Sequence, residues 1–410
     1  MKIAKNSFYN IAGYLVPGLL SIPILGFMAR NLGVEKFGLF TIMLAIVGYA
    51  SIFDIGVTRS VIREIAIYKN NKQEILKILT TSSLVVLVLG VLAGSFILFF
   101  QNFIANFLKV SSLNFEDFLT SLSIMAFTIP VYLLTQIWCS LLEGEQKFLQ
   151  LNIFKTFSGI MVVLFPGLAL LIESNLTYAV TGLLVARILS LILIKLICKN
   201  YKIKLKFHRD VFKRLISFGG WIAISNIISP LMSYFDRFIL ANKMGSSVVG
   251  FYTAPSEAIA RISMIPGAVA RTIFPMLSSG EEDSNQIKKI SYIMILVSIL
   301  PIACILTYFA KDILVIWFGY EYALEATLIF QIFIIGFIFN SIAQVPFANI
   351  QSNGGSKTTA ILHLGEVLPY FLLLYYLIDQ YGLIGAAWAW TIRMIIDFIF
   401  LFFIDSLKAK

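Results

Sequence analysis

The stretch Ala29-Arg-Asn-Leu-Gly-Val-Glu-Lys-Phe-Gly-Leu-Phe-Thr41 returns in outline as Ala241-Asn-Lys-Met-Gly-Ser-Ser-Val-Val-Gly-Phe-Tyr-Thr253. The alanine, both glycines, an aromatic residue and the threonine recur at a constant offset of 212 positions in a chain of 410 residues. The two copies lie about half a chain apart, which predicts two similar lobes. Repeated lobes in membrane transporters commonly flank the path of the substrate.

The composition indicates an integral membrane protein. Hydrophobic residues make up 59% of the chain and charged residues 13%, and the mean hydropathy is +0.88. Soluble proteins average about 45–50% apolar and about 25% charged residues. Apolar runs of about 20 residues, the length that crosses a hydrocarbon core of roughly 30 Å, recur throughout. We identify about twelve, near residues 9–29, 38–60, 76–100, 118–142, 153–172, 179–198, 216–241, 249–274, 292–310, 324–349, 361–378 and 384–404.

These runs predict an all-α integral membrane protein with about twelve transmembrane helices in two pseudo-symmetric lobes of six. The lobes are expected at residues 1–205, which include most of a basic connection at 199–215, and at residues 206–410. No obvious cleavage site follows the first run, so it is interpreted as a retained helix and not as a signal peptide. The glycines of the repeated motif are expected to form the turns that join paired helices.

Lysine and arginine concentrate in the N-terminus, in the second connection and above all in the sixth, at 199–215. The odd connections that we compare, such as the fifth and the eleventh, are poor in them. Because cytoplasmic loops carry the positive excess, both termini are predicted to be cytoplasmic. This bias also explains the formal net charge of +10 without a nucleic-acid partner.

Ionisable residues within the apolar runs mark candidate functional positions, since each costs roughly 2.5–3.5 kcal/mol at a helix centre. They are Asp54, Arg59, Arg187, Asp236, Arg237, Glu257, Arg261, Arg271, Glu366, Arg393 and Asp397. Glu257 with Arg261, and Arg393 with Asp397, are spaced to pair within one helix. For the second pair we favour a structural role; for the first, which belongs to the repeated hairpin, we favour a functional one.

The seventh run carries a polar face. Ser225, Ser229, Ser233 and Arg237 recur every four residues, and Asn226 lies beside them. In the first run, Gly13, Pro17 and Ser21 lie at the corresponding positions, and Tyr14 extends the stripe. These faces either line a cavity or allow helices to pack closely through small residues. Arg237 favours the cavity.

Several arginines within a membrane favour an anionic ligand, because a guanidinium stays charged and its planar fork fits phosphate oxygens. Arg59 and Arg271, at matching ends of the second and eighth runs, are candidates for such a site. The alternative is that arginines at helix ends extend to lipid headgroups.

Other function classes have little support. The three cysteines share no CxxC spacing, the two histidines form no metal-binding array, and a phosphate loop for ATP hydrolysis is missing. The connections are too short to hold a catalytic domain. We therefore predict a protein that is not an enzyme and needs no cofactor or metal.

The motifs resemble one known family. The segment from Asn6 to Ala66, with Asn31, Gly33, Phe37, Gly38, Asp54-Ile-Gly56, Ser60 and Arg63, resembles the N-terminal part of Wzx-type polysaccharide flippases. The run Asp236-Arg-Phe-Ile-Leu240, followed by Gly245, Gly250, Tyr252 and Ala254, does so too. These proteins belong to the multidrug/oligosaccharidyl-lipid/polysaccharide (MOP) exporter superfamily.

The resemblance implies a flippase in the bacterial cytoplasmic membrane that moves an undecaprenyl-pyrophosphate-linked oligosaccharide by alternating access. Membrane lipids are implied partners, and we include association with polysaccharide polymerase machinery among the hypotheses. Arg59, Arg237, Arg261 and Arg271 are then candidates for the pyrophosphate, and Tyr14, Asn226 and Tyr234 for the sugar. Cycling would use H⁺ or Na⁺, for which Asp54, Asp236, Glu257 and Glu366 are candidate carriers.

Two alternatives stay open. A drug or cation antiporter of the same superfamily would favour an acidic, aromatic cavity with few unpaired arginines. A membrane enzyme of polysaccharide assembly is less favoured, since the chain lacks catalytic loops.

Overall fold

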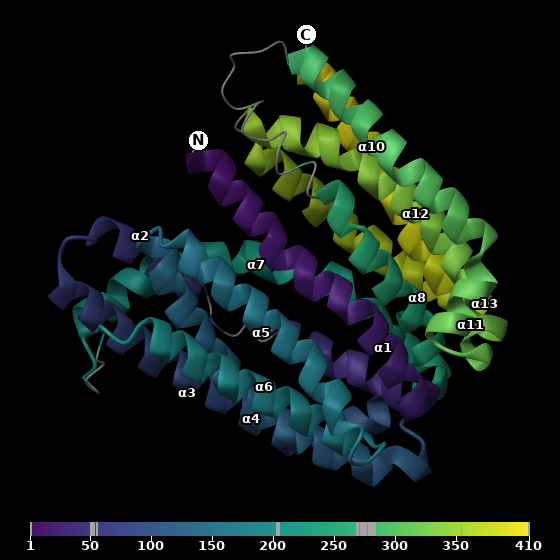
Figure 1. Ribbon diagram of the computed structural model, residues 1–410, viewed down its shortest axis with the longest axis horizontal. Helices are drawn as coiled ribbons and strands as arrows, with labels where there is room; N and C mark the ends of the chain where they lie inside the picture. Colours follow the sequence, from purple (N-terminus) through teal and green to yellow (C-terminus); the bar gives the residue numbers. More distant parts are fainter. Residues whose placement is uncertain are drawn as a thin grey trace. The chain divides into compact units, whose positions relative to one another are not determined.

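Helices dominate the computed structural model, which describes residues 2–49, 54, 56–201, 206–267, 270, 277, 284–353 and 355–408 (Figure 1). For residues 2–16, 49, 218–231, 233, 284–285, 356 and 408 it describes the backbone only. These ranges contain no β-strand.

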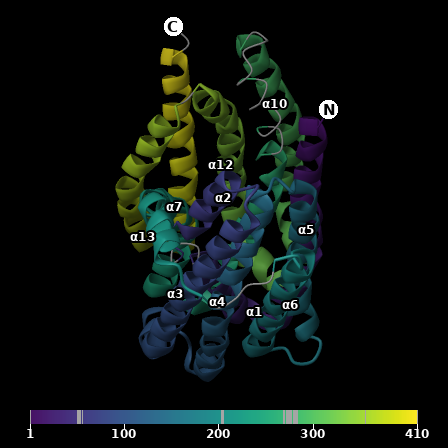
Figure 2. The same cartoon turned by 90° about the vertical axis from the view of Figure 1, so that its left-hand side faces the viewer.

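The chain divides into two compact units, residues 1–238 and 239–410. The first contains α1 (Lys2–Tyr49), α2 (Val57–Ile67), α3 (Lys72–Phe107), η2 (Ser112–Asn114), α4 (Phe115–Gly144), α5 (Phe148–Ala169), α6 (Leu176–Ile197) and most of α7 (Arg209–Met244). Within it, α3 packs along α4, α5 along α6, and α1 along α5 (Figure 2).

The second unit is built around one long helix. After the end of α7 come η3 (Ser246–Val248), α8 (Val249–Ile262), α10 (Ser284–Tyr308), α11 (Ala310–Trp317), α12 (Tyr320–Ser352) and α13 (Ser356–Lys408). Helix α12 contacts α8, α10, α11 and α13. Edge-on contacts from Tyr252 to Phe333 and from Phe333 to Trp390, each with ring centroids 5.2 Å apart, join α8, α12 and α13. Such aromatic contacts fix the packing of the three helices.

Eight helical stretches of the described chain have the length and composition to cross a membrane. Two of them, in α1 and α13, contain a non-helical glycine, Gly33 and Gly382 respectively. The stretch in α13 covers the predicted spans 361–378 and 384–404, whereas the stretch in α1, Pro17–Gly48, covers most of 9–29 and only the first part of 38–60. The other six match single predicted spans. The predicted span 216–241 falls on α7, for part of which only the backbone is described, and the predicted span 249–274 begins on α8 and ends outside the described residues.

The repeated sequence motif forms a repeated local structure. Gly33 has φ 73° and ψ 175°, and Gly245, at the same place in the second copy, has φ 91° and ψ 158°. Residues with a side chain rarely adopt this conformation, so both turns require glycine. The Thr41 hydroxyl donates to the Gly38 carbonyl over 2.7 Å, and the Thr253 hydroxyl donates to the Gly250 carbonyl over 3.4 Å. The prediction that the first glycine of each copy forms a turn is confirmed.

The division between the units lies within α7, at residues 238 and 239, some distance after the predicted boundary at 205. Contacts at the start of α7 explain why its first part clusters with residues before it. The Ser60 hydroxyl donates to the Leu215 carbonyl over 2.8 Å, and the backbone amide of His208 donates to the Thr81 hydroxyl over 3.2 Å. The arrangement as two lobes of six helices stays a prediction.

Candidate functional site

Asp54 lies where the chain enters α2. Its side chain is 6% exposed, and its Oδ1 accepts a hydrogen bond of 2.7 Å from the backbone amide of Gly56. Gly56 has a left-handed conformation, with φ 73° and ψ 8°, which a glycine adopts without strain. The Asp-Ile-Gly motif therefore forms the start of a helix, and this contact is a structural reason for a carboxylate at position 54.

This contact leads to a prediction that separates capping from ion transport. We expect Asp54→Asn to retain transport, because an amide oxygen accepts the same hydrogen bond, whereas Asp54→Ala lowers the free energy of unfolding by about 1 kcal/mol. Transport in proteoliposomes and thermal unfolding of both variants would check this. Loss of gradient-driven transport in a stably folded Asp54→Asn protein would instead identify Asp54 as an ion carrier.

Near the end of the first unit, the buried Arg237 lies against the half-buried Tyr234. Arg237 is 3% exposed, its guanidinium lies 5.4 Å from the centre of the Tyr234 ring, and its Nη1 is 3.5 Å from the Thr41 carbonyl oxygen. The neighbouring Asp236 is 4% exposed, and its Oδ1 accepts a hydrogen bond of 2.8 Å from the backbone amide of Arg237. A ring face stabilises a guanidinium without occupying the N–H groups at its edge.

A second pair of the same kind joins α4 and α6. The guanidinium of Arg187 lies 4.8 Å from the centre of the Tyr132 ring, and its buried Nε has no hydrogen-bond partner among the described residues. Tyr132 is also within electrostatic reach of Asp54 and Tyr234. We call Tyr132, Arg187, Tyr234 and Arg237 the arginine–tyrosine centre. The sequence identified Arg187 only as a charge within an apolar run, and Tyr132 carried no signal.

In the second unit, Glu257 and Arg261 form the predicted pair along α8. The Glu257 Oε2 and Arg261 Nη2 atoms are 3.1 Å apart, and Glu257 is 9% exposed. Each side chain partly neutralises the other, which reduces the cost of both charges in this helix. The predicted ion pair is confirmed, and its proposed role in substrate or ion binding stays a prediction.

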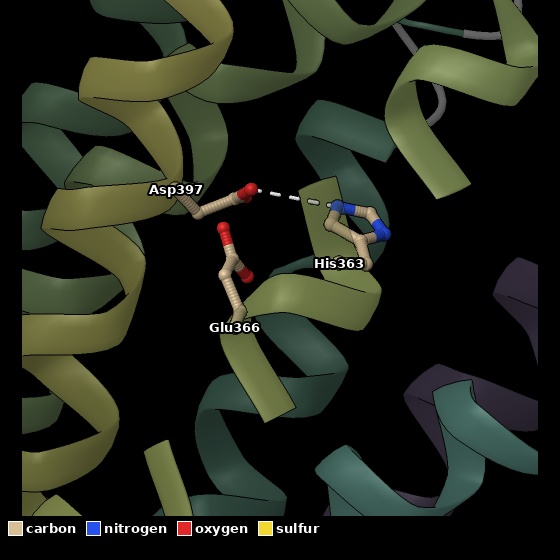
Figure 3. A group of neighbouring side chains, drawn as sticks. All are labelled: His363, Glu366 and Asp397. Atoms are coloured by element: carbon tan, nitrogen blue, oxygen red, sulfur yellow. Dashed lines mark ion pairs between the residues drawn. The ribbon is translucent and has the colours of Figure 1, made fainter. Parts of the chain in front are cut away.

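The halves of α13 bring together the side chains of His363, Glu366 and Asp397, which Figure 3 shows, and that of Arg393. The His363 Nε2 lies 3.4 Å from the Asp397 Oδ1, and the Arg393 Nε lies 3.9 Å from the Glu366 Oε2. Each of these contacts joins a residue before the break at Gly382 to a residue after it, because the two halves of α13 pack side by side as a hairpin. Helical spacing predicted a pair of Arg393 with Asp397; this was incomplete, because the fold gives each a partner on the opposite half of the hairpin.

Beside this cluster is a cavity of about 450 Å³. Its lining is mostly apolar, and Glu366, Arg393 and Tyr370 contribute polar groups. Glu366 is 8% exposed, and neither of its carboxylate oxygens has a hydrogen-bond partner in the described structure. One ligand atom from each of His363, Glu366 and Asp397 lies within 4.8 Å of the others. The predicted carrier Glu366 thus lies near His363, Arg393 and Asp397, and the sequence did not predict these contacts.

Arg59 is exposed on α2 and lies within electrostatic reach of Asp54. Arg271 lies outside the described residues, as do the side chains of Tyr14 and Asn226.

The basic connection ends in a set of ion pairs that sequence analysis missed. Arg214 approaches Glu64 through Nε at 3.2 Å and Glu74 through Nη2 at 2.6 Å, and its Nη1 donates to the Tyr68 hydroxyl over 2.8 Å. Burial opposes the charge, but the hydrogen bond to Glu74 and the charge of Glu64 raise the pKa of the Arg214 guanidinium. The end of the predicted linker is therefore fastened to α2 and α3.

Arg214→Met should lower the free energy of unfolding by roughly 1–3 kcal/mol, because it leaves the buried Glu64 carboxylate without this partner. Adding Glu64→Gln should recover part of the loss. Thermal unfolding of the single and double variants would measure both effects. Lys213→Met, which removes a neighbouring charge, is the control; equal losses in the Arg214 and Lys213 variants would contradict the assignment.

Comparisons with known proteins agree on one family. A profile described as "Polysaccharide biosynthesis protein" matches residues 3–281. The "Putative O-antigen transporter" of Shigella flexneri is 42% identical over 407 residues, which cover 98% of this chain and 97% of that protein.

Two solved structures share the fold. "Lipid II flippase MurJ", in an inward closed conformation, superimposes with a TM-score of 0.80 at 18% identity, covering 97% of this chain and 87% of that one. An inward-facing multidrug resistance MATE family transporter of the MOP superfamily gives 0.78 at 13% identity, covering 98% of each chain. These matches confirm the predicted all-helical membrane fold. The chain belongs to the polysaccharide biosynthesis protein family, as its resemblance to Wzx-type proteins predicted, and has the fold of the MOP superfamily.

Proposed function

We propose that this protein is a flippase that moves an undecaprenyl-pyrophosphate-linked oligosaccharide repeat unit across a bacterial cytoplasmic membrane. The observation that supports this most directly is the 42% identity to an O-antigen transporter over 98% of the chain. Such a task requires no bond to be broken, so the protein acts as a transporter and not as an enzyme.

The arginine–tyrosine centre is the proposed contact for the pyrophosphate. Arg187 and Arg237 each lie over a tyrosine ring in the first unit. Guanidinium groups held in this way suit the oxygens of a phosphate, which they bind through charge-assisted hydrogen bonds. Arg59, Arg261 and Arg271 are further candidates for the anion, and Tyr14, Asn226 and Tyr234 are candidates for the sugar.

Transport would proceed by alternating access and would use an ion gradient. Of the predicted carriers, Asp54 accepts a hydrogen bond from the Gly56 amide just before α2, and Glu257 pairs with Arg261. The Asp236 side chain contacts the backbone of Arg237. Glu366 lies at a cavity beside a second carboxylate and a histidine, a setting that favours it as the carrier.

The proposed location is the cytoplasmic membrane, with both termini on the cytoplasmic side. The excess of lysine and arginine in the N-terminus and in the second and sixth connections supports this orientation. Contact with polysaccharide polymerase machinery belongs to the same proposal, because a polymerase outside the membrane would use the transported unit.

Deleting the gene in its own bacterium tests the proposal. We expect loss of a surface polysaccharide and accumulation of its lipid-linked repeat unit, both reversed by a plasmid that carries the wild-type gene. Sensitivity to cationic drugs is measured in parallel. Unchanged polysaccharide with increased drug sensitivity would favour the antiporter instead.

A further inference from the structure

We propose that His363, Glu366 and Asp397 form a proton-binding site, so that the ion coupled to transport is H⁺ and not Na⁺. This rests on the proposed flippase function for its role, but the binding itself depends only on the geometry of α13. The three side chains come from both halves of the hairpin and point toward one another (Figure 3).

The charges of the cluster leave room for one proton. Glu366 and Asp397 are two carboxylates, and among the described residues Arg393 is the one fixed cation that acts on Glu366, at 3.9 Å from it. With a neutral His363 ring the four groups sum to one negative charge, which is costly in a membrane. One proton, held on the imidazole or shared by the carboxylates, brings the sum to zero.

The donor set favours a proton over a metal ion. Hard cations such as Na⁺ take oxygen ligands, whereas an imidazole at 3.4 Å from Asp397 is a good acceptor for a proton near neutral pH. A divalent cation would bring two positive charges next to the Arg393 guanidinium. The arginine thus opposes a divalent metal, and among monovalent cations the imidazole favours a proton over Na⁺.

Among the described residues, groups on the neighbouring helices do not add charge to this balance. Helix α13 packs against α12 and α8, and its Asp405, near the C-terminal end, pairs with Lys288 of α10. From α12, the Phe347 ring stacks on His363 with centroids 5.9 Å apart, and the acidic residues of that helix, Glu321 and Glu325, are near its opposite end. On α8, Glu257 and Arg261 pair with each other. The charges that act on Glu366 are those of Asp397, Arg393 and His363.

The cavity supplies a place for proton exchange. Glu366 and Arg393 contribute charged groups to its otherwise mostly apolar lining, and its volume of about 450 Å³ is large enough to hold water molecules beside them. Both oxygens of Glu366 are buried and have no hydrogen-bond partner in the described structure, so a proton or a water that carries one would satisfy them. The cluster therefore combines an acceptor, a charge that needs compensation, and an adjacent cavity.

The chain's two histidines make the site directly observable. The full-length protein is labelled at histidine, placed in lipid nanodiscs and studied by NMR, with His208→Gln to assign the His363 signal. At a fixed pH near half-protonation, Asp397→Asn and Glu366→Gln should each lower the ratio of imidazolium to imidazole on the order of tenfold. Asp379→Asn is the matched control, because this acid of α13 is exposed and pairs with Lys243.

In wild type, the ratio of imidazolium to imidazole at His363 should be the same in Na⁺ and in choline buffers. A ratio that neither cluster variant changes would overturn the proposal, as would a ratio that falls when Na⁺ or Zn²⁺ is added at constant pH, which would indicate a metal-ion site. In proteoliposomes, a pH gradient should accelerate lipid-linked oligosaccharide transfer by wild type but not by Asp397→Asn. If transfer by wild type does not depend on the pH gradient, the proposed proton site is wrong but the proposed flippase function stands. If His363 titrates as expected but the protein transfers no lipid-linked oligosaccharide, the proposed function is wrong.

Discussion

An Arg187→Leu protein is expected to unfold at a higher temperature than wild type and to transfer almost no lipid-linked oligosaccharide. The Arg187 guanidinium packs on Tyr132, and its buried Nε has no hydrogen-bond partner among the described residues. Replacing a poorly compensated charge with a hydrophobic side chain of similar volume should stabilise the protein by about 1 kcal/mol or more. The loss of a phosphate contact, worth about 1.5–3 kcal/mol, should slow transfer tenfold or more.

Opposite changes in stability and transport distinguish a ligand-binding role from a structural one. Lys195→Leu, in the last turn of the same helix, removes a comparable charge and serves as the control. Thermal unfolding and transfer rates are measured on the same preparations. If Arg187→Leu were less stable than wild type and transferred lipid at the wild-type rate, Arg187 would be a packing residue.

Arg237→Ala is expected to reduce transfer at least tenfold, and Arg237→Lys should restore part of it. The guanidinium lies over Tyr234 and near the Thr41 carbonyl, so the lysine keeps the charge but loses the planar fork. If Arg237 binds the pyrophosphate, the apparent affinity for the lipid-linked substrate should fall in both variants. The rate is measured over a range of substrate concentrations.

Arg30→Ala, which removes an exposed arginine of α1, should transfer lipid at the wild-type rate. Because Arg237 is buried, each variant is also compared with wild type by thermal unfolding. Wild-type affinity in a stably folded Arg237→Ala protein would contradict a role in binding the anion.

Local patterns in the sequence predicted local structure well. The offset of the repeat identified two glycines that share an unusual backbone conformation, because that conformation excludes other residues. The spacing of Glu257 and Arg261 predicted their ion pair, because residues four apart share one helix face.

Contacts between distant segments could not be predicted in this way. Helical spacing joined Arg393 to Asp397, yet the hairpin sets Arg393 near Glu366 and Asp397 near His363. The local sequence does not show which residues pair, because the pairs depend on how the two halves of α13 are aligned when they pack. Tyr132 was missed for the same reason, because a tyrosine in an apolar run becomes informative only when an arginine from another helix lies on its ring.

The most direct test of the account places the purified protein in liposomes with a labelled undecaprenyl-pyrophosphate oligosaccharide in one leaflet. Access of the label to a membrane-impermeant reagent in the other leaflet is followed over time. We expect the wild-type protein to transfer the label faster than protein-free liposomes do, and Arg237→Ala to reduce the transfer rate at least tenfold. Transfer by wild type that is no faster than in protein-free liposomes would contradict the proposed function.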